Sequence, residues 1–542
     1  MSGRRHTHNG ILNQQNPSGS RRLKANDAKH DAIVDDDENK DDGSVIENSS
    51  NQSTQEEIWN FVLQQLIFSR CILLAFQCFI NWIMWDWTTD AFKGIQNPIE
   101  PFDKLINFFI GGLSNWDSRH FLHIAEFGYT WESALAFFPL FPMILRLCGS
   151  LIYFFIPFIS FRYSMIVAGV IISNVSFVAA GLVLFNLIHK ITGNLKESLI
   201  SVYVFCWNPA SIFFSACYTE SLYALITFFG MYTLEQQPFS RTNQILSAVI
   251  FSFAFMTRSN GFLNIGYIGF ALLIETVVKK HKGRVTHFAV DGTLVVKAIK
   301  KIPLLLFYVL IIVLPLRIFS YAIEEKFCHS ISNHTNPWIL EYGKNESVVF
   351  PGMLEKLTWC SSLGNEFYRP SLISLFMPPY YGAIQQKYWT VGFMQYWRLR
   401  KIPLFIIASP TLGFVFYGVY TLLNDILNDK RMINHVLTDR RHPIPYALHS
   451  LFIAFCGIFI YNVESSIRLI FSSSPFIYLT FARLMSRQTP KIKVPEDLLE
   501  PFALPFLYNY ATVKPLRFLM LFYLLGYFIF GTLMHVNWLP FV

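Results

Sequence analysis

Long apolar runs recur along the chain, separated by short polar stretches. An apolar run of about 20 residues can cross the ~30 Å hydrocarbon core of a bilayer as a single α-helix. The pattern therefore predicts membrane-spanning helices at 58–84, 163–189, 198–217, 219–235, 243–258, 260–278, 302–321, 403–423, 444–461, 468–485 and 514–534.

Residues 134–158 are also apolar and form either a further span or an interfacial segment, so the expected number of spans is eleven or twelve. A membrane β-barrel would show short alternating segments instead of long unbroken runs. Only 15% of the 542 residues are charged, against about 25% in an average soluble domain. The sequence thus predicts an all-α polytopic integral membrane protein.

Residues 1–57 have the opposite character, because they are polar and include the acidic run "DDDENKDD". Such a segment cannot bury enough apolar surface to fold, which predicts a disordered tail. It also lacks the apolar core of a cleavable signal peptide. The first span is then expected to be an uncleaved anchor, and 58–542 a multi-span membrane catalytic domain.

Short basic loops stay in the cytoplasm, and the strongest one here is "KKHKGR" at 279–284. Basic clusters at 429–432, 439–442 and 486–493 agree with it. Counting spans from these loops predicts a cytoplasmic N-terminus and two large lumenal loops, at about 85–162 and 322–402.

The second predicted lumenal loop carries two kinds of modification signal. Asn333 and Asn345 begin glycosylation sequons. Cys328 and Cys360 lie in the same loop, where an oxidising compartment could join them, although both can also remain free. The other six cysteines fall in or beside apolar runs and are expected to be buried thiols.

Several classes of function are excluded by missing patterns. The net charge of +8 is modest and no basic stripe carries interleaved aromatic residues, so no nucleic-acid partner is expected. The chain has no P-loop, GxGxxG, HExxH or zinc-type Cys/His spacing. Any chemistry must therefore come from the two predicted lumenal loops and the helix ends beside them.

The segment "NWDSRHFLHIAEFGYTWESALAFFPLFP" (115–142) combines apolar character with six ionisable side chains. Asp117 can cap a short helix that Gly128 ends, with Arg119, His123 and Glu126 on one polar face. An amphipathic interfacial helix explains this pattern without any enzyme. A carboxylate beside an aromatic wall and a cation also suits a general base acting on a sugar hydroxyl.

Three further polar stretches interrupt or flank apolar runs. Tyr218 and Glu220 form a polar turn between two predicted spans, which is either a simple turn or part of a site. Arg258 and Arg468 lie at predicted span ends, where each requires a partner. That partner is a neighbouring Glu, a lipid headgroup or a lipid-linked phosphate.

The stretch 378–403 is rich in Tyr and Trp and includes Gln385 and Trp389. Interfacial aromatic belts have this composition, and so do sugar-binding surfaces. The residues alone do not separate the two interpretations.

Taken together, these motifs resemble the PIG-V family, the second mannosyltransferases of glycosylphosphatidylinositol (GPI) anchor synthesis. The similarity is carried by the following stretches, and it extends from about residue 60 to 542: "WDSRHFLHIAEFGY" with "FFPLFP", "NPASIFFSACYTESLYAL", "TRSNG", "YWTVGFMQYW" with "IPLFIIASP", and "HVNWLPFV".

The resemblance implies a GT-C-type glycosyltransferase of the endoplasmic reticulum membrane. Its donor would be dolichyl-phosphate mannose and its acceptor the one-mannose GPI glycolipid, extended through an α-1,6 linkage. By motif position the catalytic carboxylate would be Asp117, with Trp116 beside it, and His120 and Glu126 would shape the pocket. An accessory subunit in the endoplasmic reticulum is also compatible with the resemblance.

The expected reaction inverts the anomeric carbon, which requires one general base and no covalent intermediate. Dolichyl phosphate leaves as a stabilised anion, so no general acid is expected. Arg258, Arg468 and Arg119, in that order, are the candidates for binding its phosphate. Neither predicted lumenal loop has a DxD motif, so no metal is expected. Another dolichol-dependent sugar transferase, a secondary transporter and a lipid-binding scaffold are the alternatives.

Overall fold

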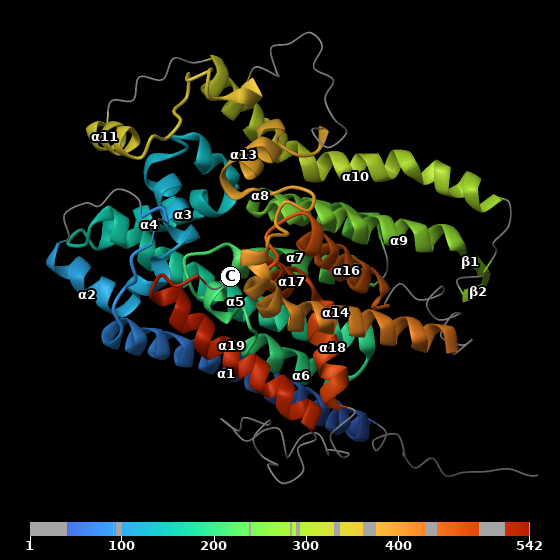
Figure 1. Ribbon diagram of the computed structural model, residues 1–542. Helices are drawn as coiled ribbons and strands as arrows, with labels where there is room; N and C mark the ends of the chain where they lie inside the picture. Colours follow the sequence, from blue (N-terminus) through green and yellow to red (C-terminus); the bar gives the residue numbers. More distant parts are fainter. Residues whose placement is uncertain are drawn as a thin grey trace, which may run out of the picture. The chain divides into compact units, whose positions relative to one another are not determined.

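The computed structural model describes residues 41–89, 91–93, 100–237, 240–281, 284–288, 293–329, 336–360, 375–428, 442–486 and 515–540 (Figure 1). Internal contacts divide the chain into two units, at residues 1–57 and 58–542. In the described part of the second unit the regular structure is helical apart from one antiparallel hairpin, β1 (Val278–His281) with β2 (Arg284–Phe288).

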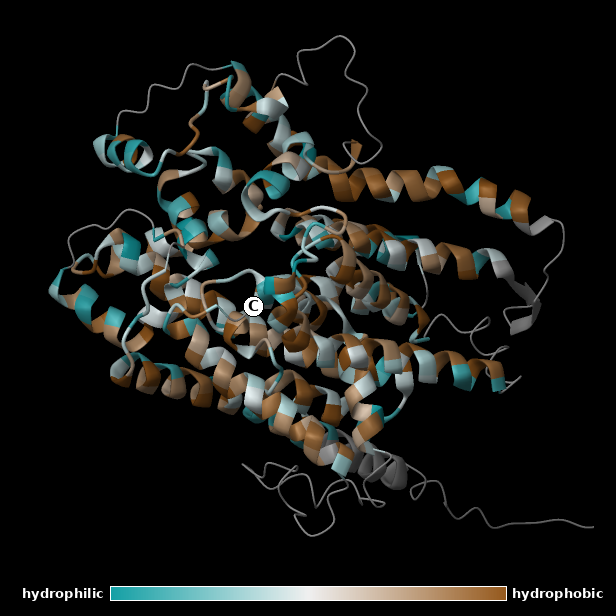
Figure 2. Cartoon of the chain, in the orientation of Figure 1, coloured by the Kyte–Doolittle hydropathy of each residue, from teal (hydrophilic) through white to brown (hydrophobic). Residues whose placement is uncertain are grey.

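Five described helices are long and apolar enough to cross a membrane. Figure 2 shows the apolar residues that run along them. These five helices are α1 (Asp41–Ile83), α5 (Phe161–Thr192), α10 (Thr293–Glu324), α14 (Ile402–Asn428) and α19 (Pro515–Val536).

Helix α1 differs from expectation at its start. It begins at Asp41, whereas the predicted span began at 58 and the tail before it was expected to be disordered. Residues 1–40 lie outside the described part of the chain, so the expectation of a disordered tail stays a prediction there.

The other predicted spans are shorter helices, among them α4 and α16, which are apolar. "WNPA" at 207–210 interrupts one of them, because Pro209 has no backbone N–H to continue a helix. Irregular backbone at membrane depth is tolerated where protein buries it. The bounds are α4 (Leu140–Phe155), α6 (Leu195–Cys206), η3 (Ser211–Phe214), α7 (Glu220–Leu234), α8 (Arg241–Thr257), η4 (Ser259–Asn264), α9 (Ile265–Val277), α16 (Ile444–Phe459), α17 (Ser465–Ser473) and α18 (Pro475–Ser486).

The two predicted loops contain helices of their own. The first holds α2 (Pro101–Ile110), η1 (Gly111–Ser114), α3 (Asp117–Phe127) and η2 (Glu132–Ala136), and the second holds η5 (Glu325–His329), α11 (Pro337–Asn345), α13 (Pro379–Trp389) and η7 (Leu399–Lys401). Cys328 and Cys360 form a disulfide in the second loop. Asn345 is exposed at the end of α11, and Asn333 lies outside the described residues.

A buried carboxylate joins these two loops. Glu132 accepts hydrogen bonds from Trp359 Nε1 (3.0 Å) and the Tyr388 hydroxyl (2.8 Å), and it forms an ion pair with Lys387. Its backbone N–H also donates to the carbonyl of Val349 (2.9 Å). Because the carboxylate is buried and fully partnered, it fixes α13 against the first loop.

A buried arginine fixes the interrupted segment after α6. Arg70 of α1 donates to the carbonyls of Cys206 (2.8 Å) and Ser211 (3.2 Å) and to the Ser211 and Ser215 hydroxyls. Its guanidinium also lies 3.8 Å from the ring centroid of Phe177. Within the described residues no acidic side chain pairs with it. Arg70 therefore satisfies backbone carbonyls that the broken helix leaves without a partner.

We expect Arg70→Met to lower the stability of the detergent-solubilised protein by about 1–3 kcal/mol, because buried acceptors lose their donor. Thermal unfolding checks this. Cys71→Ala, at the exposed neighbouring position, should change stability by less than about 0.5 kcal/mol. Equal melting temperatures for the Arg70 variant and the parent protein would contradict the role given to Arg70.

Candidate functional site

The site is centred on the first residue of α3. Trp116, which precedes that helix, has φ +58° and ψ −128°, a backbone conformation that costs about 1–3 kcal/mol and is concentrated at functional sites. The backbone N–H of Asp117 donates to the Tyr218 hydroxyl at 3.0 Å. Asp117 does not cap the helix as expected; its side chain is turned towards a different partner.

That partner is Arg468, on α17. Arg468 Nη1 lies 2.7 Å from Asp117 Oδ2 and 3.8 Å from Glu220 Oε1. Arg258 forms a second ion pair with Glu220 and donates to Thr219 Oγ1 at 2.9 Å. Two carboxylates and two guanidinium groups thus form one connected set with no net charge.

The two carboxylates differ in access. The Glu220 side chain is 0% exposed, whereas 32% of the Asp117 side chain is exposed. Glu220 is therefore enclosed between two arginines that both pair with its carboxylate. Asp117 is the carboxylate of this set that an incoming molecule can contact.

The charge environment favours the ionised form of Asp117. Burial raises the pKa of its carboxyl, but the charge and hydrogen bond of Arg468 outweigh burial, with smaller contributions from His120 and Arg258. The pKa of Asp117 therefore lies below its ordinary value, and the group is a carboxylate at neutral pH.

Helix α3 is buried inside the protein, so the prediction of an amphipathic interfacial helix is wrong. His123, expected on a water-facing side, is buried; it hydrogen-bonds Thr130 (2.7 Å) and stacks on Trp131 with centroids 3.9 Å apart. Phe121 and Ile124, on its other faces, are buried too. The helix periodicity was interpreted correctly, but the surface that would cover it was not visible in the sequence.

An aromatic wall borders the site on the side of α13. The His120 ring is stacked between Phe92 and Phe137, with centroids 4.3 Å and 4.5 Å away, and burial lowers its pKa to about 4. Trp389 packs edge-on against both His120 and Phe137. His120 is therefore an uncharged member of the wall at neutral pH.

Gln385 lies on α13 one turn before Trp389 and interacts with the Tyr381 side chain. The Tyr381 hydroxyl in turn donates to Ser259 Oγ (2.9 Å), directly after Arg258. The structure therefore brings the aromatic stretch next to the arginines, and these contacts favour a site boundary over a free membrane belt.

Two predicted residues point elsewhere. Glu126 pairs with Arg162 at 3.5 Å, away from Asp117. The Arg119 guanidinium lies 5.7 Å from the Trp538 ring centroid, and no described acidic side chain forms an ion pair with it. Trp116 also packs on Trp538 (5.7 Å), so the segment after α19 adjoins this site.

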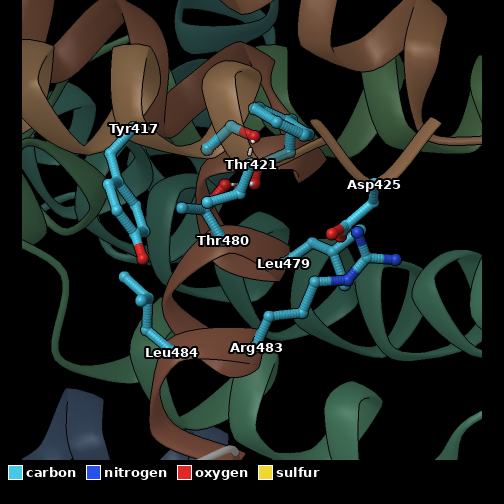
Figure 3. A pocket seen from close by; sticks show the side chains of 9 residues that line it. Tyr417, Thr421, Asp425, Leu479, Thr480, Arg483 and Leu484 are labelled. Atoms are coloured by element: carbon cyan, nitrogen blue, oxygen red, sulfur yellow. Dashed lines mark hydrogen bonds between the residues drawn. The ribbon is translucent and has the colours of Figure 1, made fainter. Parts of the chain in front are cut away.

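One hollow in the described structure is separate from these residues. It lies between α14 and α18 (Figure 3). Tyr417, Asp425 and Arg483 are among its lining residues, and Arg483 Nε lies 3.6 Å from Glu197. None of the predicted site residues lines it. In the described part of the chain, no three His, Cys, Asp or Glu side chains gather as metal ligands would.

The fold and the site define a multi-pass helical membrane protein with a carboxylate–guanidinium set among its helix ends. The family model described as "Mannosyltransferase (PIG-V)" matches residues 58–542. The chain therefore belongs to this family and is a mannosyltransferase, which confirms the resemblance carried by the motifs.

The names of similar proteins agree with membership of this family. The chain is 29% identical to GPI alpha-1,6-mannosyltransferase 2 of Cricetulus griseus, over 88% of this chain and 98% of that protein. It is 28% identical to GPI alpha-1,6-mannosyltransferase 2 of Homo sapiens (88% and 98%) and to GPI mannosyltransferase pigv-1 of Caenorhabditis elegans (94% and 84%). An oligosaccharyltransferase structure from Archaeoglobus fulgidus aligns with a TM-score of 0.39 at 9% identity, over 86% of this chain and 55% of that one.

Replacing Arg468 should change how mannosyl transfer depends on pH. In the parent protein the lowered pKa of Asp117 keeps the carboxylate ionised until the pH falls below its ordinary range. Arg468→Met removes the attraction and leaves burial, which raises the pKa, so the acid limb of the rate profile should move towards neutral pH. Rate profiles of microsomal transfer from about pH 4 to 8 measure this shift.

Arg483→Met is the matched control, because Arg483 pairs with Glu197 outside the site. Its acid limb should coincide with that of the parent. An unmoved acid limb in the Arg468 variant would contradict the control of Asp117 by Arg468.

Proposed function

We propose that this protein transfers a mannose from dolichyl-phosphate mannose to the one-mannose GPI glycolipid, forming an α-1,6 linkage in the lumen of the endoplasmic reticulum. The observation that carries the proposal is the exposed Asp117 carboxylate, held at 2.7 Å by Arg468 in a protein of this family. The names of the relatives supply the linkage and the GPI acceptor.

Asp117 acts as the general base. It accepts the proton of the acceptor hydroxyl while that oxygen attacks the anomeric carbon of the donor mannose. The bond from this carbon to the phosphate oxygen breaks, and dolichyl phosphate leaves with the electron pair as an anion. One displacement inverts the β-linked donor into an α-linked product, so a single carboxylate suffices.

Arg468 binds the donor phosphate. Its Nε is buried and has no hydrogen-bond partner among the described residues, so it can still donate to a phosphate oxygen. Arg258 touches the enclosed Glu220 and Thr219 instead of Asp117, so Arg468 replaces it as the first candidate. A phosphate bound to Arg468 also weakens the electrostatic attraction between this arginine and Asp117. The pKa of Asp117 then rises, so the carboxylate is a stronger base when the donor is present.

The site suits two lipid substrates. Its ion pairs join Asp117 of α3, Glu220 of α7 and Arg468 of α17, and α17 packs against α7. A sugar headgroup can reach Asp117 while its lipid chain stays in the bilayer. The aromatic wall of Phe137 and Trp389 offers apolar ring faces to a sugar.

We expect Asp117→Asn to reduce formation of the two-mannose GPI lipid at least about 100-fold, because general-base catalysis contributes roughly 10²–10⁴-fold. The assay uses microsomes from cells without the endogenous enzyme, supplied with dolichyl-phosphate mannose and the one-mannose GPI lipid. Products are identified by mass spectrometry.

Asp86→Asn is the matched control, since it makes the same change at an exposed position outside the site. It should retain parent-like activity at equal protein level. Near-normal extension by the Asp117 variant would refute its role as a base. A parent protein that ignores this acceptor but extends another dolichol-linked or protein acceptor would refute the assigned substrate.

A further inference from the structure

A histidine at the end of α19 lies against the site, and the mechanism above does not use it. His535 is 2% exposed. Its ring packs edge-on against Phe213 (centroids 5.3 Å apart) and Tyr218 (5.4 Å). Tyr218 is the residue whose hydroxyl accepts the backbone N–H of Asp117. The imidazole is close enough to interact electrostatically with both Asp117 and Arg468.

The imidazole has an unused polar atom. Its Nε2 is buried and has no hydrogen-bond partner among the described residues. A buried polar atom without a partner is costly, and native structures contain few of them. The atom is therefore expected to find its partner in a molecule that enters the site.

The backbone next to His535 is hydrogen-bonded to the segment that precedes Asp117. The carbonyl of Val536 accepts a hydrogen bond from Asn115 Nδ2 at 2.8 Å, two residues before Asp117. Trp538 packs on Trp116. The histidine is therefore held in a fixed relation to Asp117, as a residue that orients a substrate needs to be.

Burial without a partner does not by itself indicate a ligand. His449 is also buried, and neither of its ring nitrogens has a partner among the described residues. Its ring packs against Tyr267, away from any site carboxylate. What distinguishes His535 is that its ring packs against Phe213 and Tyr218, the same two rings over which the Arg468 guanidinium lies at 5.6 Å and 6.0 Å.

We propose that His535 binds a hydroxyl group of the mannose that is transferred, by a hydrogen bond through Nε2. This inference rests on the proposed function. The donor phosphate is a monoanionic diester and is drawn to the guanidinium of Arg468, whereas a ring nitrogen such as Nε2 matches a sugar hydroxyl, which can both donate and accept. His535 is thus a substrate-binding residue that distinguishes the sugar-bearing lipid from the free lipid phosphate.

The test compares His535→Leu and His535→Gln with the parent protein in two measurements. The first is transfer kinetics with dolichyl-phosphate mannose as the varied substrate. His535→Leu should lower kcat/KM about 10–100-fold, because one hydrogen bond to the substrate is lost. His535→Gln, whose amide can reach a similar position, should recover at least part of that loss.

The second measurement is binding to the purified protein of two lipids, dolichyl-phosphate mannose and dolichyl phosphate. His535→Leu should bind the mannose-bearing lipid more weakly than the parent and the free lipid phosphate equally well. His449→Leu, a buried histidine outside the site, should match the parent in both measurements.

The outcomes separate this inference from the proposed function. A parent protein that transfers no mannose to the GPI lipid refutes the proposed function. An active parent with an equally active His535→Leu variant refutes only the role of His535. Equal weakening for both lipids would mean that the histidine binds phosphate, and this also overturns the proposal. If the Leu variant does not accumulate, His535→Phe, which keeps a ring but has no hydrogen-bonding atom, replaces it in both measurements with the same expected results.

Discussion

The ion pairs between two arginines and two carboxylates are the interaction on which the site depends. Charged groups are expensive at membrane depth unless they are paired and hydrogen-bonded. Here Glu220 is enclosed between Arg258 and Arg468, and Arg468 extends the pairing to Asp117. The pairing lets the protein keep a partly exposed carboxylate at the edge of an apolar helix assembly, and it decides which of the two carboxylates a substrate can touch.

These four side chains come from helix ends, which requires interrupted helices. A continuous helix through residues 198–235 would have satisfied its own backbone and left no turn for Tyr218 and Glu220. The break at Pro209 instead frees carbonyl groups that need donors, and Arg70 supplies them from α1. Arg70 in α1 and the ion pairs around Asp117 thus have the same physical effect. Both reduce the free-energy cost of irregular polar structure in an apolar protein.

The sequence predicted the members of the site better than their arrangement. Helix content and the long spans follow from apolar runs, and Asp117 stood out through the motif around it. The pairing of Asp117 with Arg468 joins positions 351 residues apart, and no local pattern encodes such a contact. Glu132 is likewise one of six ionisable residues in its segment, and no local pattern shows that its partners lie in the second loop. The burial of α3 was missed because its periodicity fits a membrane surface and a protein interior equally well.

A lowered pKa makes Asp117 a weak base in the absence of substrate, which at first argues against a catalytic role. The objection weakens when the charge of the donor is included. A phosphate near Arg468 adds negative charge beside the carboxylate and competes for the same guanidinium, and both effects raise the proton affinity of Asp117. Each pKa unit gained corresponds to about 1.4 kcal/mol of added preference for the proton. A base that strengthens only when the donor is bound would accept the hydroxyl proton at the moment when the displacement can occur, and it would remain paired and stable at other times.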